Sequence, residues 1–229
     1  MLRTENLSKG FTLHLRGGVH IPVLSGVDLV VHAGECVVLA GPSGAGKSTL
    51  MRSLYANYRT QGGRILIRHH GEMVDIVAAD PRIVLAVRRE TLGYVSQFLR
   101  VVPRVPALDI VAEVLTSRGT AVEEARRRAT DMLLRLNIPR RLHAIPPATF
   151  SGGEQQRVNL ARGLIAGYPM LLLDEPTASL DAGNRAVVVG MVHEAKARGT
   201  AIVAICHDAD VRDAIADRLF SLEPLQDAA

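Results

Sequence analysis

The chain contains no tryptophan, and aromatic residues make up only 3% of its 229 residues. Its apolar runs consist of valine, isoleucine, leucine and alanine, which is typical of a buried parallel sheet that helices cover. A chain of this length can bury a substantial apolar core as one large domain or as one domain with a lobe. The composition therefore argues against disorder and favours a globular α/β fold.

Long hydrophobic runs are absent as well. No apolar run approaches the ~20 residues that a membrane-spanning helix needs, and the first residues, MLRTENLSKGF, contain no apolar signal core. We therefore expect a cytoplasmic protein with no direct membrane insertion, at most peripheral to a membrane.

Cysteine is scarce, since only Cys36 and Cys206 occur. Cys36 starts one strand-like run and Cys206 ends another, so in parallel strands their thiols would lie ~15 Å apart, too far for a disulfide. We interpret both as small buried apolar residues in a reducing compartment.

A stripe of basic residues interleaved with aromatic ones is also missing. The formal net charge is +4, but the arginines form short groups with acidic residues between them. Such groups are typical of solvated helix faces. We expect no nucleic-acid partner.

Short apolar runs rich in β-branched residues predict strands. Early runs lie close together, as in an antiparallel sheet, whereas later runs alternate with helical patterns, as in a parallel sheet. The predicted strands are VLSGVDLVV (23–31), CVVLAG (36–41), GRILIR (63–68), LGYVSQ (92–97), MLLLD (170–174), TAIVAIC (200–206) and DRLFSL (217–222). The layout predicts a single mixed α/β domain over 1–229.

Residues from about 98 to 168 contain no strand-like run and predict a helical lobe inserted between two strands, with 1–97 and 169–229 forming the core and its β subdomain. One helix is expected over 120–136, with Thr120 and Glu123 as a capping box. A second helix follows Ser151, and prolines mark the joints. The expected inward face of the first helix is Val122, Ala125, Ala129, Met132, Leu133 and Leu136.

The segment GPSGAGKST follows a predicted strand and opens a helix, and it contains the full G-x-x-x-x-G-K-[ST] pattern. Its glycines let backbone N–H groups converge on phosphate oxygens, and the following helix directs its positive end toward them. Lysine supplies a point charge for the outer phosphates, and serine offers a hydroxyl to Mg²⁺. The segment predicts a nucleoside triphosphate site formed by Gly41, Pro42, Ser43, Gly44, Ala45, Gly46, Lys47, Ser48 and Thr49.

Two carboxylates emerge together where the buried run MLLLD ends. Ligands of α/β proteins bind at the carboxyl ends of the strands. Asp174 suits contact with Mg²⁺, and Glu175 can accept a proton from an attacking water. His207 ends another strand-like run and would lie at the same edge, whereas His69 and His70 are interpreted as surface or turn residues without metal-ligand spacing.

The stretch FSGGEQQRVNLARG begins an amphipathic helix with two adjacent glycines. Ser151 and Glu154 alone satisfy a capping box, which leaves Gly152 and Gly153 unexplained because each costs up to ~1 kcal/mol relative to alanine. A helix start that binds an anion explains them, because bare backbone lets a phosphate approach the N–H groups.

Taken in order, GPSGAGKST, Gln97, FSGGEQQR, LLLDEP, SLD and CHD resemble the nucleotide-binding domain of the ABC ATPase superfamily over nearly the whole chain. The resemblance implies ATP hydrolysis with Mg²⁺ in a head-to-tail dimer, in which one protomer's phosphate loop and the other's signature hold each ATP. The implied roles are adenine stacking for Phe11, Mg²⁺ or water contact for Gln97, the signature for Ser151, Gly152 and Gly153, metal contact for Asp174, catalytic base for Glu175, dimer contact for Asp181 and γ-phosphate switch for His207.

Three residues depart from the common pattern of that family: Phe11 for tyrosine, Phe150 for leucine and Glu154 for glutamine. A carboxylate beside a γ-phosphate would be repelled. We therefore expect Glu154 to turn toward the backbone N–H of Ser151.

Three further segments, RHHGEMVDIVAA, SQFLRVVPRVPALDIVAE and LNIPRRLHAIPPATFSGGEQQRVN, resemble the L-component family of ATPases of the bacterial phosphonate carbon–phosphorus lyase system. This resemblance implies a homodimer or a heterodimer with a second ABC ATPase, the K component, acting on the soluble lyase core complex. The alternative is the energising subunit of a membrane transporter, docked through the segment after Gln97. An ATP-gated clamp on nucleic acid is disfavoured, because no sustained heptad stretch occurs.

Overall fold

A computed structural model describes residues 1–13, 18–97, 99 and 103–225. The first part of the chain forms an antiparallel sheet with the strand order β2-β1-β5-β6, and β3 pairs with β1. Its strands are β1 (Leu2–Leu13), β2 (Val19–Val27), β3 (Val30–Val31), β5 (Gly62–His69) and β6 (Glu72–Asp75). The expected antiparallel β subdomain is therefore present.

A second sheet is entirely parallel, with the strand order β10-β4-β9-β8-β7. All five residues of β8 and of β9 are buried, which explains why their sequences are continuous apolar runs rather than alternating ones. The strands are β4 (Cys36–Ala40), β7 (Leu92–Val95), β8 (Met170–Asp174), β9 (Ala201–Ile205) and β10 (Arg218–Ser221).

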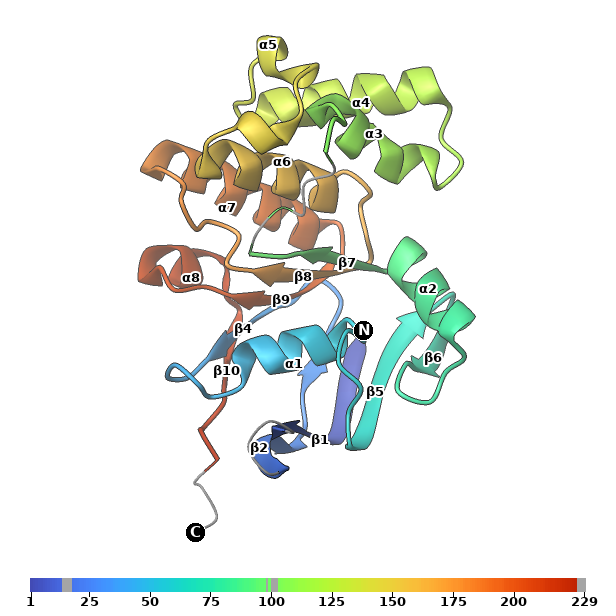
Figure 1. Cartoon of the computed structure of the whole chain (residues 1–229), viewed down its shortest axis with the longest axis vertical. Helices are drawn as coiled ribbons and strands as arrows, with labels where there is room; N and C mark the ends of the chain where they lie inside the picture. The colour runs from blue at the N-terminus through green and yellow to red at the C-terminus, as the bar shows by residue number, and fades with distance from the viewer. Residues whose placement is uncertain (14–17, 98, 100–102, 226–229) are drawn as a thin grey trace.

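Helices cover both faces of this parallel sheet (Figure 1). On one face, α1 (Lys47–Leu54) lies between the two sheets, and α2 (Pro81–Glu90) leads into β7. On the other face α7 (Ala182–Ala197) packs with α8 (Ala209–Ile215), and the helical lobe stands above them. The lobe consists of α3 (Ala107–Thr116), α4 (Val122–Arg135), α5 (Arg140–His143), a 3₁₀ turn (Pro147–Thr149) and α6 (Gly152–Leu164).

The alternating directions of the side chains along the central strands divide the apolar interior into two cores. Val37 and Leu39 of β4 join α1 and the antiparallel sheet, whereas Cys36 and Val38 join the helices of the lobe. Successive side chains of a strand point to opposite faces, so a strand buried on both faces serves both cores. The two cores hold the lobe and the β subdomain on a common sheet.

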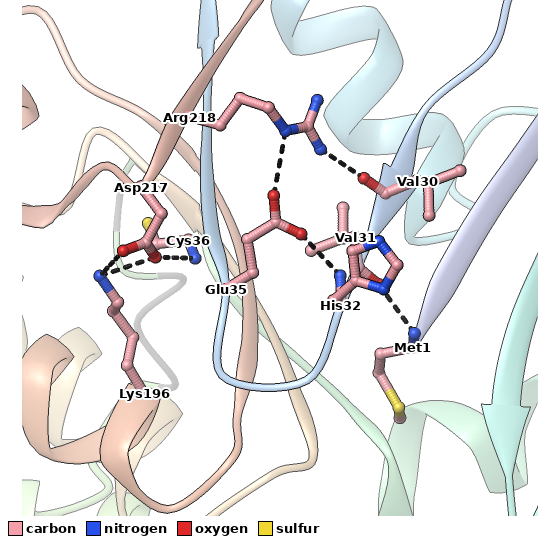
Figure 2. Close-up of polar contacts among 9 residues, drawn as sticks. All are labelled: Met1, Val30, Val31, His32, Glu35, Cys36, Lys196, Asp217 and Arg218. Carbon is pink, nitrogen blue, oxygen red and sulfur yellow. Dashed lines mark hydrogen bonds and ion pairs between the residues drawn. The ribbon is translucent and has the colours of Figure 1, made fainter.

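A polar network ties the chain together where β4 and β10 begin (Figure 2). The Glu35 carboxylate accepts from the N–H of His32 at 2.7 Å and pairs with Arg218 at 3.0 Å. Asp217 accepts from the N–H of Cys36 at 2.8 Å and pairs with Lys196 at 2.7 Å. These contacts secure the amino ends of the strands and leave the carboxyl ends for the loops of the site.

The start of α4 differs from the sequence prediction. Ala121 is the N-cap, no side chain caps the helix, and Val122 is 59% exposed rather than inward. The N–H of Thr120 donates to the carbonyl of Leu115 at 3.0 Å, so Thr120 closes the end of α3 and is not available to start α4. The predicted capping box of Thr120 and Glu123 was therefore wrong, although Ala125, Ala129 and Leu133 are buried as expected.

Both cysteines are free thiols, with Cys36 buried and Cys206 half-buried. Burial raises the pKa of each thiol to about 12, so neither forms a thiolate near neutral pH. Within the described ranges, no helix combines the length and the apolar character that a bilayer crossing requires.

Candidate nucleotide site

The phosphate loop connects the end of β4 to the start of α1, as predicted. Gly46 is the N-cap of α1 and has φ 91°. A Cβ at Gly46 would lie 2.8 Å from Cδ2 of Leu24 and 3.0 Å from the carbonyl oxygen of Val23. Only glycine fits this close approach of the loop to β2, and only glycine adopts this φ without strain. The packing thus explains the second glycine of the motif.

The N-terminus of α1 has no side-chain cap and no acidic residue in its first turn. Its backbone donors therefore have no competing anion from within the helix, which is the arrangement that binds phosphate. The Lys47 ammonium donates to the carbonyls of Gly41 at 2.7 Å and Pro42 at 2.8 Å, which holds this charge beside the loop. Ser48 is exposed in the first turn, where its hydroxyl is accessible.

Asp174 ends β8 with its side chain buried and accepts a hydrogen bond from the Tyr94 hydroxyl at 2.9 Å. Burial raises the pKa of Asp174, and the neighbouring Glu175 raises it further. A bound cation would favour the charged carboxylate. The Asp174 carboxylate, the Ser48 hydroxyl and the Gln97 amide oxygen are the hard oxygen donors that Mg²⁺ prefers, so these residues fit that ion.

Glu175 lies at the centre of the site. Gln97 donates from Nε2 to one carboxylate oxygen of Glu175 at 3.0 Å, and Nε2 of His207 lies 2.9 Å from the other oxygen. These three side chains follow β7, β8 and β9, three neighbouring parallel strands. Glu175 itself has φ 51°, a left-handed conformation that is strained for a non-glycine residue and recurs at functional sites.

The start of α6 contains the predicted capping box. The Ser151 hydroxyl accepts from the N–H of Glu154 at 3.3 Å, and the Glu154 carboxylate accepts from the N–H of Ser151 at 2.8 Å. Hydrogen bonds from the Ser151 hydroxyl and N–H lower the pKa of Glu154. Glu154 therefore turns back onto Ser151, as expected.

The two glycines of this helix start are in different surroundings. A Cβ on Gly152 would meet no atom within 4 Å, whereas a Cβ on Gly153 would lie 2.8 Å from the carbonyl oxygen of Ser179. Gly153 is thus explained by packing within this chain, against the loop after β8. A Cβ on Gly152 would enter open space, so packing among the described residues does not explain this glycine, and an anion has room to approach it.

Polar side chains that the sequence analysis passed over connect these loops. Gln156 donates to the carbonyl of Pro176 at 3.2 Å, and Asn159 donates to the carbonyl of Ser96 at 2.6 Å. Both are buried on the inward face of α6, so the signature helix is bonded to the loops that carry Glu175 and Gln97. The sequence signal that indicates such residues is the presence of amide side chains on an otherwise apolar face of a helix.

Arg185 of α7 makes a further connection, since it donates to the carbonyl of Leu180 at 3.0 Å and pairs with Asp208. The loop that contains Asp181 is therefore bonded to the residue after His207. Asp181 itself is the N-cap of α7 and accepts from the N–H and the side-chain amide of Asn184 at 2.8 and 2.7 Å.

Phe11 lies on β1 opposite Ile21 of β2, and its ring contacts Tyr58 edge-on at 5.3 Å. The Lys9 ammonium lies 4.6 Å from the centre of the Phe11 ring. The adenine-stacking role of Phe11 stays a prediction, as do the roles of Asp181 and Thr49 toward nucleotide.

A cavity of about 920 Å³ opens between the core and the helical lobe, and Gln97 and Asp174 form part of its wall. We call it the arginine cleft, after the cations among its lining residues. The segment FLRVVPRVPALD, the expected docking surface after Gln97, lies partly outside the described residues. The charged lining consists of Arg52, Arg88, Arg89, Arg118, Arg162, Glu113 and Asp174.

The family model described as ABC transporter matches residues 24–178. The chain is 36% identical over 195 residues to the macrolide export ATP-binding/permease protein MacB of Hyphomonas neptunium, a match that covers 85% of this chain and 30% of that protein. It is 39% identical over 198 residues to the pyoverdine export ATP-binding/permease protein PvdT of Pseudomonas putida, with the same coverage. It is also 33% identical over 211 residues to the ABC transporter ATP-binding protein YvrO of Bacillus subtilis, covering 92% of this chain and 89% of that protein.

The chain therefore spans less than a third of the length of two of these relatives, MacB and PvdT. Among solved structures, the ATP-binding cassette MJ0796 in a dimeric post-hydrolysis state with ADP and Pi superposes with a TM-score of 0.88 at 28% identity. The superposition covers 99% of this chain and 97% of that one. The mixed α/β fold with its β subdomain and helical lobe is thus confirmed.

Proposed function

This chain belongs to the ABC transporter family and is an ATPase, and we propose that it forms half of an ATP-driven dimer that changes the conformation of a docked partner. The observation that carries the proposal is the position of Glu175. Its carboxylate is held by Gln97 and His207 at the edge of the parallel sheet that also carries the phosphate loop. A carboxylate fixed there is suited to accept a proton from a water that attacks a bound triphosphate.

In this proposal, residues 41–49 hold the phosphates of ATP, and Ser48, Gln97 and Asp174 hold Mg²⁺. The metal, when bound, supplies positive charge that neutralises the phosphate oxygens. The Lys47 ammonium, which donates to the carbonyls of Gly41 and Pro42 in the structure, would pair with the outer phosphates instead when ATP is bound, since its side chain is flexible. Phe11 stacks on the adenine.

Glu175 orients the attacking water and takes its proton as the bond from the water oxygen to the γ-phosphorus forms, while the bond from that phosphorus to the bridging oxygen breaks and ADP leaves with the electron pair. Gln97 and His207 keep the Glu175 carboxylate in a single orientation, and His207 is exposed enough to reach the γ-phosphate. Preorganised donors of this kind stabilise charge where it develops in the transition state. The signature residues Ser151, Gly152 and Gly153 of a partner protomer complete the site from the opposite side, and Asp181 lies in the loop between the two protomers.

A homodimer fits this arrangement, as does a heterodimer with a second ABC ATPase such as the K component. The related cassette MJ0796 is dimeric in two solved structures. The hydrogen bonds of Gln156 and Asn159 join the signature helix to the catalytic loops, so movement of the lobe and the state of Glu175 are connected mechanically.

For the partner, the relatives favour a membrane transporter, because MacB and PvdT carry both an ATP-binding part and a permease part in their names. The positive charge of the arginine cleft is suited to bind an acidic segment on the cytoplasmic side of that permease. The resemblance of three segments to the carbon–phosphorus lyase ATPases supports a second partner, the soluble lyase core complex of phosphonate catabolism.

Replacing Glu175 with Gln tests the catalytic proposal. We expect hydrolysis to fall about 10²- to 10⁴-fold, because the general base is lost, while ATP binding remains and the ATP-bound dimer accumulates. Phosphate release and size-exclusion chromatography with ATP measure the two effects. Glu123→Gln on the exposed face of α4 serves as the matched control, and unchanged turnover in Glu175→Gln would contradict the assignment.

Affinity purification from the native host under ATP, after mild solubilisation of membranes, distinguishes the two partners. Recovery of permease subunits supports the transporter, and recovery of soluble lyase subunits excludes it. The double variant Arg89→Ala/Arg118→Ala should lose the permease while keeping ATP binding, because both arginines line the cleft and neither belongs to the phosphate loop.

A further inference from the structure

A second cluster of ligand-type side chains lies at the amino end of β7, the end opposite Gln97. The side chains come from the tip of the β5–β6 hairpin and from the last turn of α2. One ring nitrogen of His69, one of His70 and one carboxylate oxygen of Glu90 all lie within 4.8 Å of one another. From the sequence, the histidine pair was interpreted as surface or turn residues without metal-ligand spacing. Glu90 lies 20 positions beyond His70, too far along the chain to be recognised as a third ligand.

The hairpin turn brings the two imidazoles together. His70 and Gly71 have φ 49° and 89°, the paired positive values of a tight two-residue turn, and the rings of His69 and His70 lie 4.0 Å apart. Nε2 of His70 lies 2.8 Å from Oε2 of Glu90. The His70 side chain is 71% exposed, so its ring can turn to admit an ion between the two atoms.

His69 is held by a buried residue that is not itself a ligand. The Thr91 hydroxyl lies 2.6 Å from Nδ1 of His69, and Thr91 is only 4% exposed. Histidines that bind metals are typically oriented by a hydrogen bond at the ring nitrogen that does not face the metal. If Nδ1–H donates to Thr91, Nε2 of His69 keeps the lone pair that a cation requires.

Two imidazoles and a carboxylate form the ligand set that binds Zn²⁺ or a neighbouring transition ion with one position left for water. Mg²⁺ prefers an all-oxygen shell and does not match this set. Arg89 pairs with the other oxygen, Oε1, of Glu90, which leaves Oε2 for the ion, and its positive charge weakens cation binding without blocking it. We propose that His69, His70 and Glu90 form a transition-metal site of the zinc class, positioned by Thr91, which fastens the β5–β6 hairpin to the junction of α2 and β7.

The test uses the full chain without a polyhistidine tag and without nucleotide, titrated with Zn²⁺ by calorimetry. We expect one site per chain, and a Co²⁺-loaded sample with the visible absorption of a four-coordinate ion. His70→Asn keeps a residue that tolerates positive φ while removing the imidazole, and Glu90→Gln removes the charge with little change of shape. Each should weaken Zn²⁺ binding at least tenfold, and Thr91→Val should weaken it about 10- to 100-fold.

His193→Asn on the exposed surface of α7 is the matched control and should bind Zn²⁺ like the wild type. Thermal unfolding without metal verifies that every variant is folded, and Zn²⁺ should raise the melting temperature of the wild type but not of His70→Asn. Affinity within twofold of the wild type in His70→Asn or Glu90→Gln would overturn the proposal. Displacement of bound Zn²⁺ by millimolar Mg²⁺ would overturn the assignment of this site to a transition metal.

Discussion

Two helices of this protein, α1 and α6, begin beside glycines whose small size lets a phosphate approach the backbone. Their first turns differ, because only one of them is capped by side chains. At α1, the N-cap is Gly46, no side chain caps the helix, and the first turn contains no acid. At α6, the N-cap is Ser151, and both halves of a capping box are formed with Glu154. The first helix start is open toward a ligand, and the second is closed by its own side chains.

The difference shows that the N-terminus of a helix can bind an anion in two different ways. An open helix start leaves backbone donors and the positive end of the dipole to a bound anion, so α1 can bind phosphate without help. A capped start is stable in the isolated chain, and the small size of Gly152 still allows an anion to approach. We infer that α6 receives its phosphate only when a second protomer presents it.

The largest expected effect on ATP binding comes from Lys47→Ala at the open helix start. Loss of the ammonium should weaken ATP binding by the isolated chain about 10- to 150-fold, because hydrogen bonds to charged groups contribute about 1.5–3 kcal/mol. Fluorescent-nucleotide titration measures the affinity. Thermal unfolding without nucleotide provides the control, and unaltered affinity would contradict the role given to α1.

Gly152→Leu at the capped helix start should leave nucleotide binding unchanged and lower hydrolysis by at least about 10²-fold, because a side chain there blocks the phosphate of the facing protomer. A Cβ at Gly152 meets nothing within 4 Å, so the isolated fold should tolerate the change. Gly190→Leu on α7, also without neighbours within 4 Å, is the matched control. Gly153 is unsuitable for this test, because its replacement would displace Ser179 within the same chain. Weaker nucleotide binding by monomeric Gly152→Leu would count against the inference.

Ser151→Ala removes the cap of α6 and should lower the free energy of unfolding by about 1 kcal/mol. Denaturant unfolding measures the loss. No comparable loss is expected at α1, whose start has no side-chain cap to remove. An equal stability of Ser151→Ala and the wild type would show that the capping box contributes nothing.

The smallest effect concerns the pH dependence of that cap. Hydrogen bonds from Ser151 hold the pKa of Glu154 below its usual value, so the charged carboxylate stabilises the folded state above the unfolded pKa of about 4.3. This contribution is lost as the pH falls through the lowered folded value. The stability difference between the wild type and Glu154→Gln, measured by unfolding at pH 7 and at successively lower pH, should therefore shrink below about pH 4. A difference that is constant over that range would contradict the capping role of the charge.

Much of the fold was predictable, because each predicted strand run overlaps a strand of the structure, although β1 and β6 were not predicted. The predicted start of α4 was wrong, because the N–H of Thr120 donates to the carbonyl of Leu115 and closes the C-terminus of α3, a local bond that helical periodicity does not reveal. The capping box at Ser151 and Glu154 was predictable since its partners are three residues apart. Gln156, Asn159 and Arg185 were missed because their acceptors are the carbonyls and carboxylate of loops elsewhere in the chain.

The sequence by itself determined the features whose atoms are neighbours along the chain: the phosphate loop with its glycines, the paired carboxylates after β8 and the capped start of α6. Tertiary structure alone decided which distant residues meet. Parallel strands end at one edge, so Gln97 and His207 converge on Glu175 there, and a tight hairpin set against the end of α2 places two histidines beside Glu90. Spacing along the chain determines local geometry through the backbone, whereas these meetings depend on strand order and on packing across two cores.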